Sequence, residues 1–346
     1  MKRNTILTIS AIILLFVLMI IANNALDTYL LRILNLCAIY TVLGLSMNLI
    51  NGFTGLFSLG HAGFMAVGAY VTALFTMPIA TKEMNFFMAP LVSPLDKFVL
   101  PFLPSLIFAG LFSALIAFLI GAPVLRLKGD YLAIATLGFG EIIRVIFTNT
   151  QNLTNGALGL KSIPLTTNIW WSFGLAAVTA VVLLSLINSS YGRAFKAIRE
   201  DEIAAESMGI YLFKHKIWSF VIGAFFAGIG GGLLSNLIGA IDPLMFRFTT
   251  TYNILLIIVL GGMGSITGTI ISAFIITIAQ EGLRFLDEAM IPGIPALPGL
   301  RMVVFSVLLM VVVLFFRHGL MGTREFSWDK LLGVFSKKPL AKGGNK

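Results

Sequence analysis

Charged side chains are rare in the long apolar runs of this sequence, and these few are the first candidates for chemistry. The stretch "TLGFGEIIRVIF" places Glu141 and Arg144 three residues apart, so they share one helix face and can pair. An ion pair in such a run is either a structural pair or part of a functional site. His61 is a candidate proton-relay group, although a lone buried histidine is more often a hydrogen-bonded packing residue. Arg32 lies near the start of a run and is expected to extend its charge to the interface.

Small residues cluster in the same runs, as in "SLGHAGFMAVGAY", "GIGGG" and "GGMGSITG". Small side chains let helix backbones approach closely. The clusters also favour helix breaks, which lipid tolerates only where they are buried in protein or line a cavity. Tight packing is the alternative explanation for each glycine. The candidates for helix breaks or for lining a cavity are Gly60, His61, Gly138, Gly140, Glu141, Gly261 and Ser265.

Several classes of chemistry have no motif here. The apolar runs contain no chain of Asp, Glu and His, which argues against a proton-coupled carrier. The sequence contains no metal-ligand cluster, no catalytic serine or cysteine constellation and no phosphate-binding loop. We therefore expect no enzyme activity, no bound cofactor and no metal in this chain. If nucleotide supplies energy, another subunit must hydrolyse it.

The composition is that of a membrane protein. Of 346 residues, 58% are apolar and 11% are charged, against about 25% charged in soluble domains. A span needs roughly 20 apolar residues, and only helices of this length satisfy their own backbone in lipid. The sequence thus predicts an all-α, polytopic transmembrane helical bundle. The net charge of +9 is better explained by the orientation of basic loops than by nucleic acid. The single cysteine, Cys37, excludes an internal disulfide.

Basic residues in short loops mark the cytoplasmic side, which predicts that both termini are cytoplasmic and that the number of spans is even. About ten spans (8–10) are expected. The first apolar run is longer than the core of a cleaved signal peptide, which favours an uncleaved span. Residues 1–316 then form the membrane domain and 317–346 a basic cytoplasmic tail. A break is expected at 261–265, and segments 78–98, 148–168 and 283–300 are expected outside. The predicted spans are 6–22, 29–49, 57–77, 99–121, 131–147, 169–188, 217–240, 251–263, 265–282 and 301–316.

The cytoplasmic loop 189–216 has a different composition from its neighbours. Its positive and negative charges are intermixed, so it is not a polybasic lipid-binding patch. Residues 194–208 contain no Gly or Pro and many helix formers, and Gly209 is a suitable stop. This pattern predicts a short helix docked on a protein surface; a solvated connector helix is the alternative.

The stretch "IAAESMG" (203–209) resembles the EAA signature of ABC importer permeases. The resemblance implies that Ala204, Ala205 and Gly209 sit in a groove of an ATPase subunit, with Asp201 and Glu202 as rim contacts. The signature's first Glu is replaced by isoleucine here, and its downstream Ile-x-Leu-Pro part is not evident.

Six stretches, in order, resemble the permease of high-affinity branched-chain amino acid importers of the LivM type: 57–70, 127–144, 153–160, 192–210, 220–233 and 259–273. The resemblance implies a multi-pass protein of the bacterial cytoplasmic (inner) membrane. It also implies four kinds of partner: a sister permease in a heterodimer, two ATPase subunits that use ATP, an extracytoplasmic substrate-binding protein and the small solute itself. The chain would contact membrane lipid and would not bind nucleic acid. The cavity-lining candidates would then border the pathway. Asn155, Gly156 and Gly159 would either face the binding protein or simply form a turn.

Three alternatives remain open. Permeases for urea, short amides or another small solute look similar to this sequence. A secondary carrier without an ATPase would show a coupling-ion site at the midplane. A membrane enzyme or assembly scaffold would show converging acid, base or metal residues.

Overall fold

The computed structural model describes residues 2–127, 129–286, 299–300, 303–307, 310, 319–322 and 325. Their secondary structure is helical, apart from one isolated antiparallel bridge between Leu160 and Ile241. The prediction of an all-α fold is therefore confirmed for the described residues.

The helices have the following bounds: α1 Lys2–Ala25, α2 Thr28–Asn48, η1 Leu49–Phe53 (a π-helical continuation of α2), α3 His61–Thr76, α4 Ile79–Asn85, α5 Phe102–Val124, α6 Asp130–Asn149, α7 Gln151–Thr154, η2 Gly156–Leu158, α8 Ile169–Asn188, α9 Ser190–Glu200, α10 Glu202–Ser207, α11 Leu212–Ile238, η3 Pro243–Phe246, α12 Phe248–Gly261, α13 Ile266–Gly282 and η4 Leu283–Leu286.

Nine of the ten predicted spans correspond to helices: α1, α2, α3, α5, α6, α8, α11, α12 and α13. The predicted tenth span, 301–316, and the basic tail, 317–346, lie mostly outside the described residues. The predicted break at 261–265 is confirmed, because α12 ends at Gly261 and α13 begins at Ile266. The start of the third span was predicted four residues too early: residues 55–60 are non-helical, and α3 begins at His61.

By length and apolar composition, five helical stretches of the described chain can each cross a membrane: 28–53, 102–124, 130–149, 169–188 and 212–238. The helices α3, α12 and α13 have 16, 14 and 17 residues and are shorter than the roughly 20 residues of a full span. The described chain is thus a multi-pass membrane bundle, and the total of ten spans stays a prediction.

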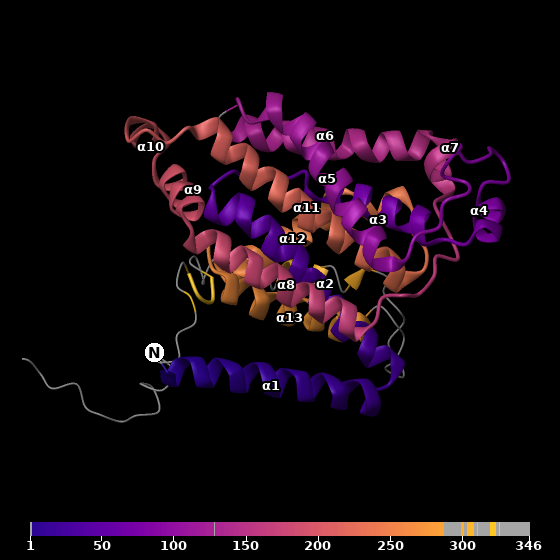
Figure 1. Cartoon of the computed structure of the whole chain (residues 1–346), viewed down its shortest axis with the longest axis horizontal. Helices are drawn as coiled ribbons and strands as arrows, with labels where there is room; N and C mark the ends of the chain where they lie inside the picture. Colours follow the sequence, from indigo (N-terminus) through magenta and orange to yellow (C-terminus); the bar gives the residue numbers. More distant parts are fainter. Residues whose placement is uncertain are drawn as a thin grey trace, which may run out of the picture.

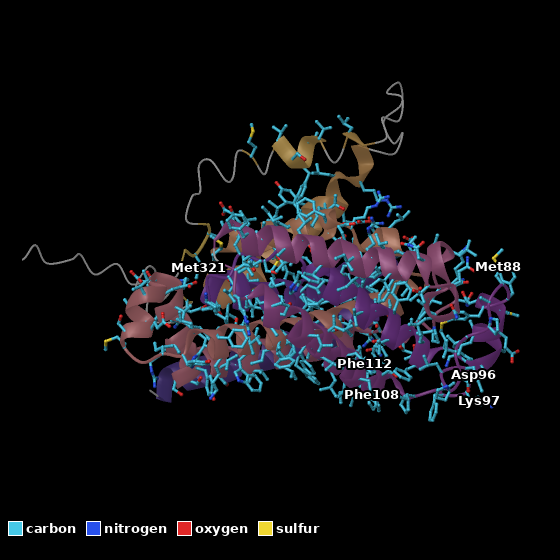
Figure 2. The ribbon with its side chains drawn as sticks, turned by 90° about the horizontal axis from the view of Figure 1, so that it is seen from above. Met88, Asp96, Lys97, Phe108, Phe112 and Met321 are labelled. Carbon is cyan, nitrogen blue, oxygen red and sulfur yellow. The ribbon has the colours of Figure 1, made fainter. Side chains whose placement is uncertain are left out.

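Three helices form the centre of the bundle: α2, α3 and α11. About 78% of the most apolar stretch of α2, and likewise of α11, is buried inside the molecule, against 33%, 22% and 28% for α5, α6 and α8. The outer helices direct large apolar side chains outward: Phe108 and Phe112, one turn apart on α5, project from the edge of the bundle and are 43% and 44% exposed (Figure 2). Such side chains suit a lipid-facing surface.

Glycines determine how closely the central helices pack. A Cβ at Gly68 of α3 would overlap the backbone of Gly228 on α11, and one at Gly231 would overlap the carbonyl oxygen of Met65. The helices α3 and α11 therefore meet backbone against backbone, as the small-residue clusters predicted.

The loops gather at two opposite ends of the bundle (Figure 1). One end carries α4 and α7, where Asn236 at the end of α11 donates to Thr76, Pro164 and Thr166 at 3.0–3.1 Å. The other end carries α9 and α10, and α1 also begins there. Segments predicted to lie on the same side of the membrane are thus together, while the assignment of one end to the cytoplasm stays a prediction.

The loop helix predicted over 194–208 is wrong in one respect, because it is two helices. The chain leaves helical geometry at Asp201 (φ −159°, ψ 115°). The Asp201 carboxylate accepts hydrogen bonds from Ile203 N and Ala204 N at 2.8 and 3.0 Å. An aspartate N-cap thus overrides the helix propensity of its neighbours. The predicted stop at Gly209 is confirmed, with φ of +83°.

We predict that Gly68→Ala lowers the midpoint of thermal unfolding of the detergent-solubilised protein. The added methyl group meets backbone atoms that cannot rotate away, and overpacking of this kind costs about 1–3 kcal/mol. Gly174→Ala on α8 is the matched control, because a Cβ there meets nothing within 4 Å. Equal midpoints for the two variants would contradict the backbone contact between α3 and α11.

Candidate functional site

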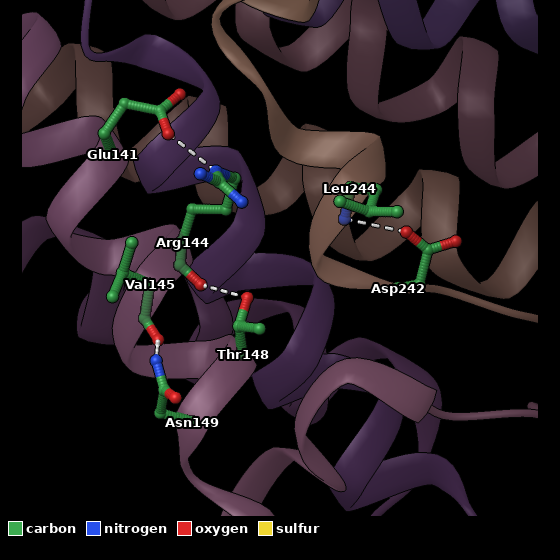
Figure 3. Close-up of polar contacts among 7 residues, drawn as sticks. All are labelled: Glu141, Arg144, Val145, Thr148, Asn149, Asp242 and Leu244. Carbon is green, nitrogen blue, oxygen red and sulfur yellow. Dashed lines mark hydrogen bonds and ion pairs between the residues drawn. The ribbon is translucent and has the colours of Figure 1, made fainter.

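Glu141 and Arg144 form an ion pair on the flank of α6. Arg144 Nε donates to Glu141 Oε2 at 2.6 Å, as Figure 3 shows. The two side chains remain 34% and 23% exposed. One turn further along, the side chains of Thr148 and Asn149 donate to backbone carbonyls of α6 at 2.9 and 2.8 Å. The ion pair is therefore a partly uncovered charged group on a helix that is otherwise mostly apolar.

The start of α3 lies against α6 near this pair. Leu59 N donates to Thr136 Oγ1 at 3.0 Å, and Ala62 N donates to Thr251 Oγ1 at 2.9 Å. A Cβ at Gly60 would overlap the carbonyl oxygen of Thr136. Thr136 is six residues into α6, so α3 begins about 9 Å inside the level at which α6 begins. The first turn of α3 is thus an interrupted helix end within the bundle.

The structure brings three of the predicted cavity-lining residues together. Gly60, Gly140 and Glu141 line one small cavity of about 10 Å³ between α3, α6 and the start of α12. This volume holds about one water molecule.

Four other candidates lie elsewhere. His61 is turned towards α2, where its Nε2 shares a hydrogen bond of 2.8 Å with Ser46 Oγ, and it is buried. Gly138 lies on α6, and a Cβ there would meet nothing within 4 Å. Gly261 and Ser265 lie at the turn between α12 and α13.

The α12–α13 turn is held by an asparagine that sequence reasoning missed. Asn48, fully buried at the end of α2, donates to Ser265 O at 2.9 Å and to Thr269 Oγ1 at 2.7 Å. Its Oδ1 accepts a hydrogen bond from Gly264 N at 2.9 Å. Gly264 has φ of +92°, which favours glycine. One amide thus supplies the acceptor for Gly264 N–H and an additional donor to Ser265 O at the helix break.

The same turn is capped from the C-terminal part of the chain. The Glu325 carboxylate accepts hydrogen bonds from Ile266 N and Thr267 N at 2.7 and 3.1 Å, where α13 begins. Met321 N donates to Gly261 O at 3.1 Å, and Met321 lies towards the α9–α10 end of the molecule (Figure 2). A carboxylate at a helix N-terminus is favourable for both hydrogen bonding and the helix dipole.

The loop residues differ in their accessibility. Ala205 is 4% exposed and faces the protein, whereas Ala204, Asp201 and Gly209 are exposed. Glu202 accepts a hydrogen bond from Lys216 Nζ at 2.6 Å, which ties α10 to α11. Three apolar side chains at the tip of this charged loop project into the surroundings: Ile203, Met208 and Tyr211 are 76%, 83% and 68% exposed.

Arg199 on α9 is the second residue that sequence reasoning missed. Its Nη1 donates to Gly52 O at 3.1 Å in the π-helical end of α2. A Cβ on Gly264 would lie 2.7 Å from the same Nη1. Charge alone does not separate Arg199 from Arg193 on the same helix; the signal was its place beside the buried apolar face formed by Phe195 and Ile198.

Among the described residues, no group of three or more His, Cys, Asp and Glu side chains is placed to hold a metal ion. The polar groups described above pair with one another and with the backbone. Their arrangement is that of joints between helices.

A family model for the permease component of branched-chain amino acid transport systems matches residues 29–314. The chain belongs to this family. This permease is 35% identical over 290 residues to the high-affinity branched-chain amino acid transport system permease protein LivM of Escherichia coli (strain K12). The aligned region covers 74% of the chain and 64% of that relative. This permease is also 25% identical over 321 residues to the probable LivM permease of Methanocaldococcus jannaschii, 82% of the chain and 90% of that relative.

The E. coli protein LivH, a permease protein named for the same kind of transport system, is 26% identical over 265 residues, 70% of the permease described here and 80% of LivH. The permease spans less than two thirds of the length of the LivM proteins of E. coli and Salmonella typhimurium, 64% and 62%. No solved structure matches the chain.

We predict that Asn48→Ala destabilises the α12–α13 turn and lowers the midpoint of thermal unfolding. The substitution leaves the buried Gly264 N–H without its acceptor, and one orphaned buried group costs about 1–3 kcal/mol. Asn149→Ala is the control, because the exposed Asn149 side chain bonds only to its own helix at Val145 O. If both variants unfolded at the wild-type temperature, the asparagine would not hold the turn.

Proposed function

We propose that this chain is the permease subunit of an ATP-binding-cassette importer that carries leucine, isoleucine and valine across a bacterial cytoplasmic membrane. The observation that carries the proposal is the family match over residues 29–314. The names of the LivM relatives supply the substrate class. The chain itself performs no reaction in this proposal and binds no cofactor, and partner subunits hydrolyse ATP.

The loop 189–216 supports coupling to a separate ATPase. Its tip presents the side chains of Ile203, Met208 and Tyr211, which are 68–83% exposed, among charged residues. Apolar side chains that are exposed beside charges fit a protein interface better than a lipid surface. We assign Ala204, Gly209, Asp201 and Glu202 to the same contact. Ala205 is buried and faces the protein, so we assign it to the packing of α10 and not to the contact with the ATPase.

The flank of α6 supports a pathway on that side of the bundle. Charged side chains in membrane spans face the protein interior or a water-filled cavity. Since Glu141 and Arg144 remain partly exposed within one chain, a second subunit or a pathway must cover them. Gly138 leaves open space on the same helix. We propose that a sister permease packs on this flank of α6, and that it is related to this chain as LivH is to LivM. The transport path would then be enclosed between the two chains.

Transport then follows from movement between two packings of the bundle. An extracytoplasmic binding protein delivers the amino acid, the ATPases move the loops at the α9–α10 end, and the cavity between the permeases changes its opening. The small cavity at Gly60, Gly140 and Glu141 represents a closed contact in this cycle. Interfaces of packed helices switch between discrete arrangements.

We predict that cells lacking this chain lose uptake of radiolabelled leucine, isoleucine and valine but retain uptake of urea. The wild-type gene should restore uptake, and Gly209→Leu should restore little, with the protein still present in the membrane. An L-residue at the φ of +83° seen at Gly209 costs about 1–2 kcal/mol, and it misplaces the end of α10.

Gly209→Asn is the matched control, since asparagine tolerates the left-handed region, and it should restore uptake more fully. A loss confined to urea would retain the importer and change its cargo. Unchanged uptake of all four solutes would contradict the proposed substrate class, and full activity of Gly209→Leu would contradict the role of the α10 end.

We predict that Gly138→Trp blocks uptake while the assembled complex still hydrolyses ATP. A Cβ at Gly138 meets nothing within 4 Å in the single chain, so we expect the obstruction to arise in the assembled pathway. Gly174→Trp on α8, where a Cβ also meets open space, should leave uptake unchanged. Equal uptake by the two variants would contradict the proposal that α6 borders the pathway.

A further inference from the structure

Three separate parts of the chain meet at one point at the α9–α10 end of the bundle. They are the π-helical end of α2, the turn between α12 and α13, and helix α9 of the charged loop. Gly52 and Gly264 approach so closely that a Cβ on Gly52 would lie 2.6 Å from Gly264 N. Asn48 joins the first two parts through buried hydrogen bonds. A cavity of about 390 Å³ opens beside this point, lined in part by Lys196, Arg199, Gly264 and Glu325.

Arg199 is the loop residue whose side chain enters this junction. Its guanidinium donates to Gly52 O at 3.1 Å and pairs with Glu200 at 2.5 Å. Its Cα and Cβ lie against Gly55, where a side-chain Cβ would come within 3.1–3.2 Å of them, and its Nη1 lies against Gly264. The glycines at 55 and 264 thus leave the space that the arginine side chain occupies.

The geometry suits arginine specifically. A planar guanidinium can donate to a carbonyl from one nitrogen and to a carboxylate from others, whereas a lysine ammonium acts as a point charge. The Gly52 carbonyl is available because α2 ends there in a π-helical turn, and such turns are frequent at functional sites. The loop is also linked to the bundle by the continuous chain at both of its ends, by the Glu202–Lys216 pair to α11, and by the buried Phe195, whose ring contacts His215 of α11.

We propose that Arg199 is the positioning residue that transmits movement of the α9–α10 loop to the end of α2 and to the α12–α13 turn. The inference rests on the proposed function, since it requires an ATPase that moves this loop. When α9 shifts, the guanidinium pulls the Gly52 carbonyl through its hydrogen bond and pushes against Gly264. The end of α2 and the α12–α13 hairpin then shift together. Without the arginine, less of the loop's movement reaches the end of α2 and the α12–α13 turn.

The test uses the complete complex of both permeases, the ATPase subunits and the binding protein, reconstituted in proteoliposomes. Three variants are compared with the wild type: Arg199→Met, Arg199→Lys and the control Arg193→Met. Arg193 lies on the same helix with an exposed side chain. Leucine uptake, ATP hydrolysis and the amount of assembled complex are measured on the same preparations.

We expect Arg199→Met to assemble normally and to hydrolyse ATP within about twofold of the wild-type rate. Its leucine uptake per ATP should fall about tenfold, within the range of a coupling free energy between two sites. Arg199→Lys should be intermediate, and Arg193→Met should match the wild type. Uptake per ATP of Arg199→Met that equals that of Arg193→Met would overturn the inference.

Hydrogen–deuterium exchange separates transmission from simple support of the fold. In the wild type, trapping the ATPases with ATP and vanadate should change exchange in peptides from the loop, from residues 48–56 and from residues 260–268. In Arg199→Met, only the loop peptides should respond. A response of all three regions in the variant would contradict the proposal, even if its stability were reduced. If the wild-type complex failed to form or to transport, the proposed function itself would fail, which is a distinct result.

Discussion

A helix that begins inside a membrane bundle leaves backbone N–H groups open, and one that ends there leaves C=O groups open, and lipid satisfies neither. The interrupted helices of this permease meet that constraint with side chains from distant parts of the chain. Leu59 and Ala62, at the start of α3, donate to Thr136 of α6 and Thr251 of α12. At the α12–α13 turn, Gly264 donates to Asn48, and Ile266 donates to Glu325. Each interruption therefore ties together helices that are distant in sequence.

These ties explain why the close glycine contacts lie where they do. A threonine or asparagine side chain is short, so the helix that supplies it must come near the interrupted end. Gly60 packs against the backbone of Thr136, and Gly52 packs against Gly264. The central pair α3 and α11, with Gly68 against Gly228, adds a contact in which backbones meet without side chains between them. A bundle joined in this way offers short, directional contacts that can exchange as units between two arrangements.

The sequence predicted the features that depend on neighbouring residues. Helices followed from apolar runs, the ion pair from the three-residue spacing of Glu141 and Arg144, and the break at 261–265 from its glycines together with the charge rule. The split of the loop at Asp201 was missed because a capping carboxylate competed with the helix formers around it. Asn48 was missed because its partner Gly264 lies 216 residues away in the sequence. Arg199 was missed because its partner Gly52 lies 147 residues away. The local sequence does not identify those partners, although the buried face of Phe195 and Ile198 places Arg199 beside the bundle.

The loop is joined to the bundle unequally on its two helices, and this inequality bears on how the permease can work. On α10, the apolar tip of Ile203 and Met208 is exposed, and the tie to the bundle is the Glu202–Lys216 pair. On α9, Phe195 and Ile198 are buried, and Arg199 reaches the α12–α13 turn. Between them Asp201 breaks the helix, and its carboxylate caps the start of α10, so α9 and α10 have separate axes. The exposed apolar side chains and the contact with the bundle are thus carried on separate helices joined by a capped break. A single continuous helix would impose one rotation on both; in the function we propose, the break allows α10 to adapt to a partner subunit before force reaches α9.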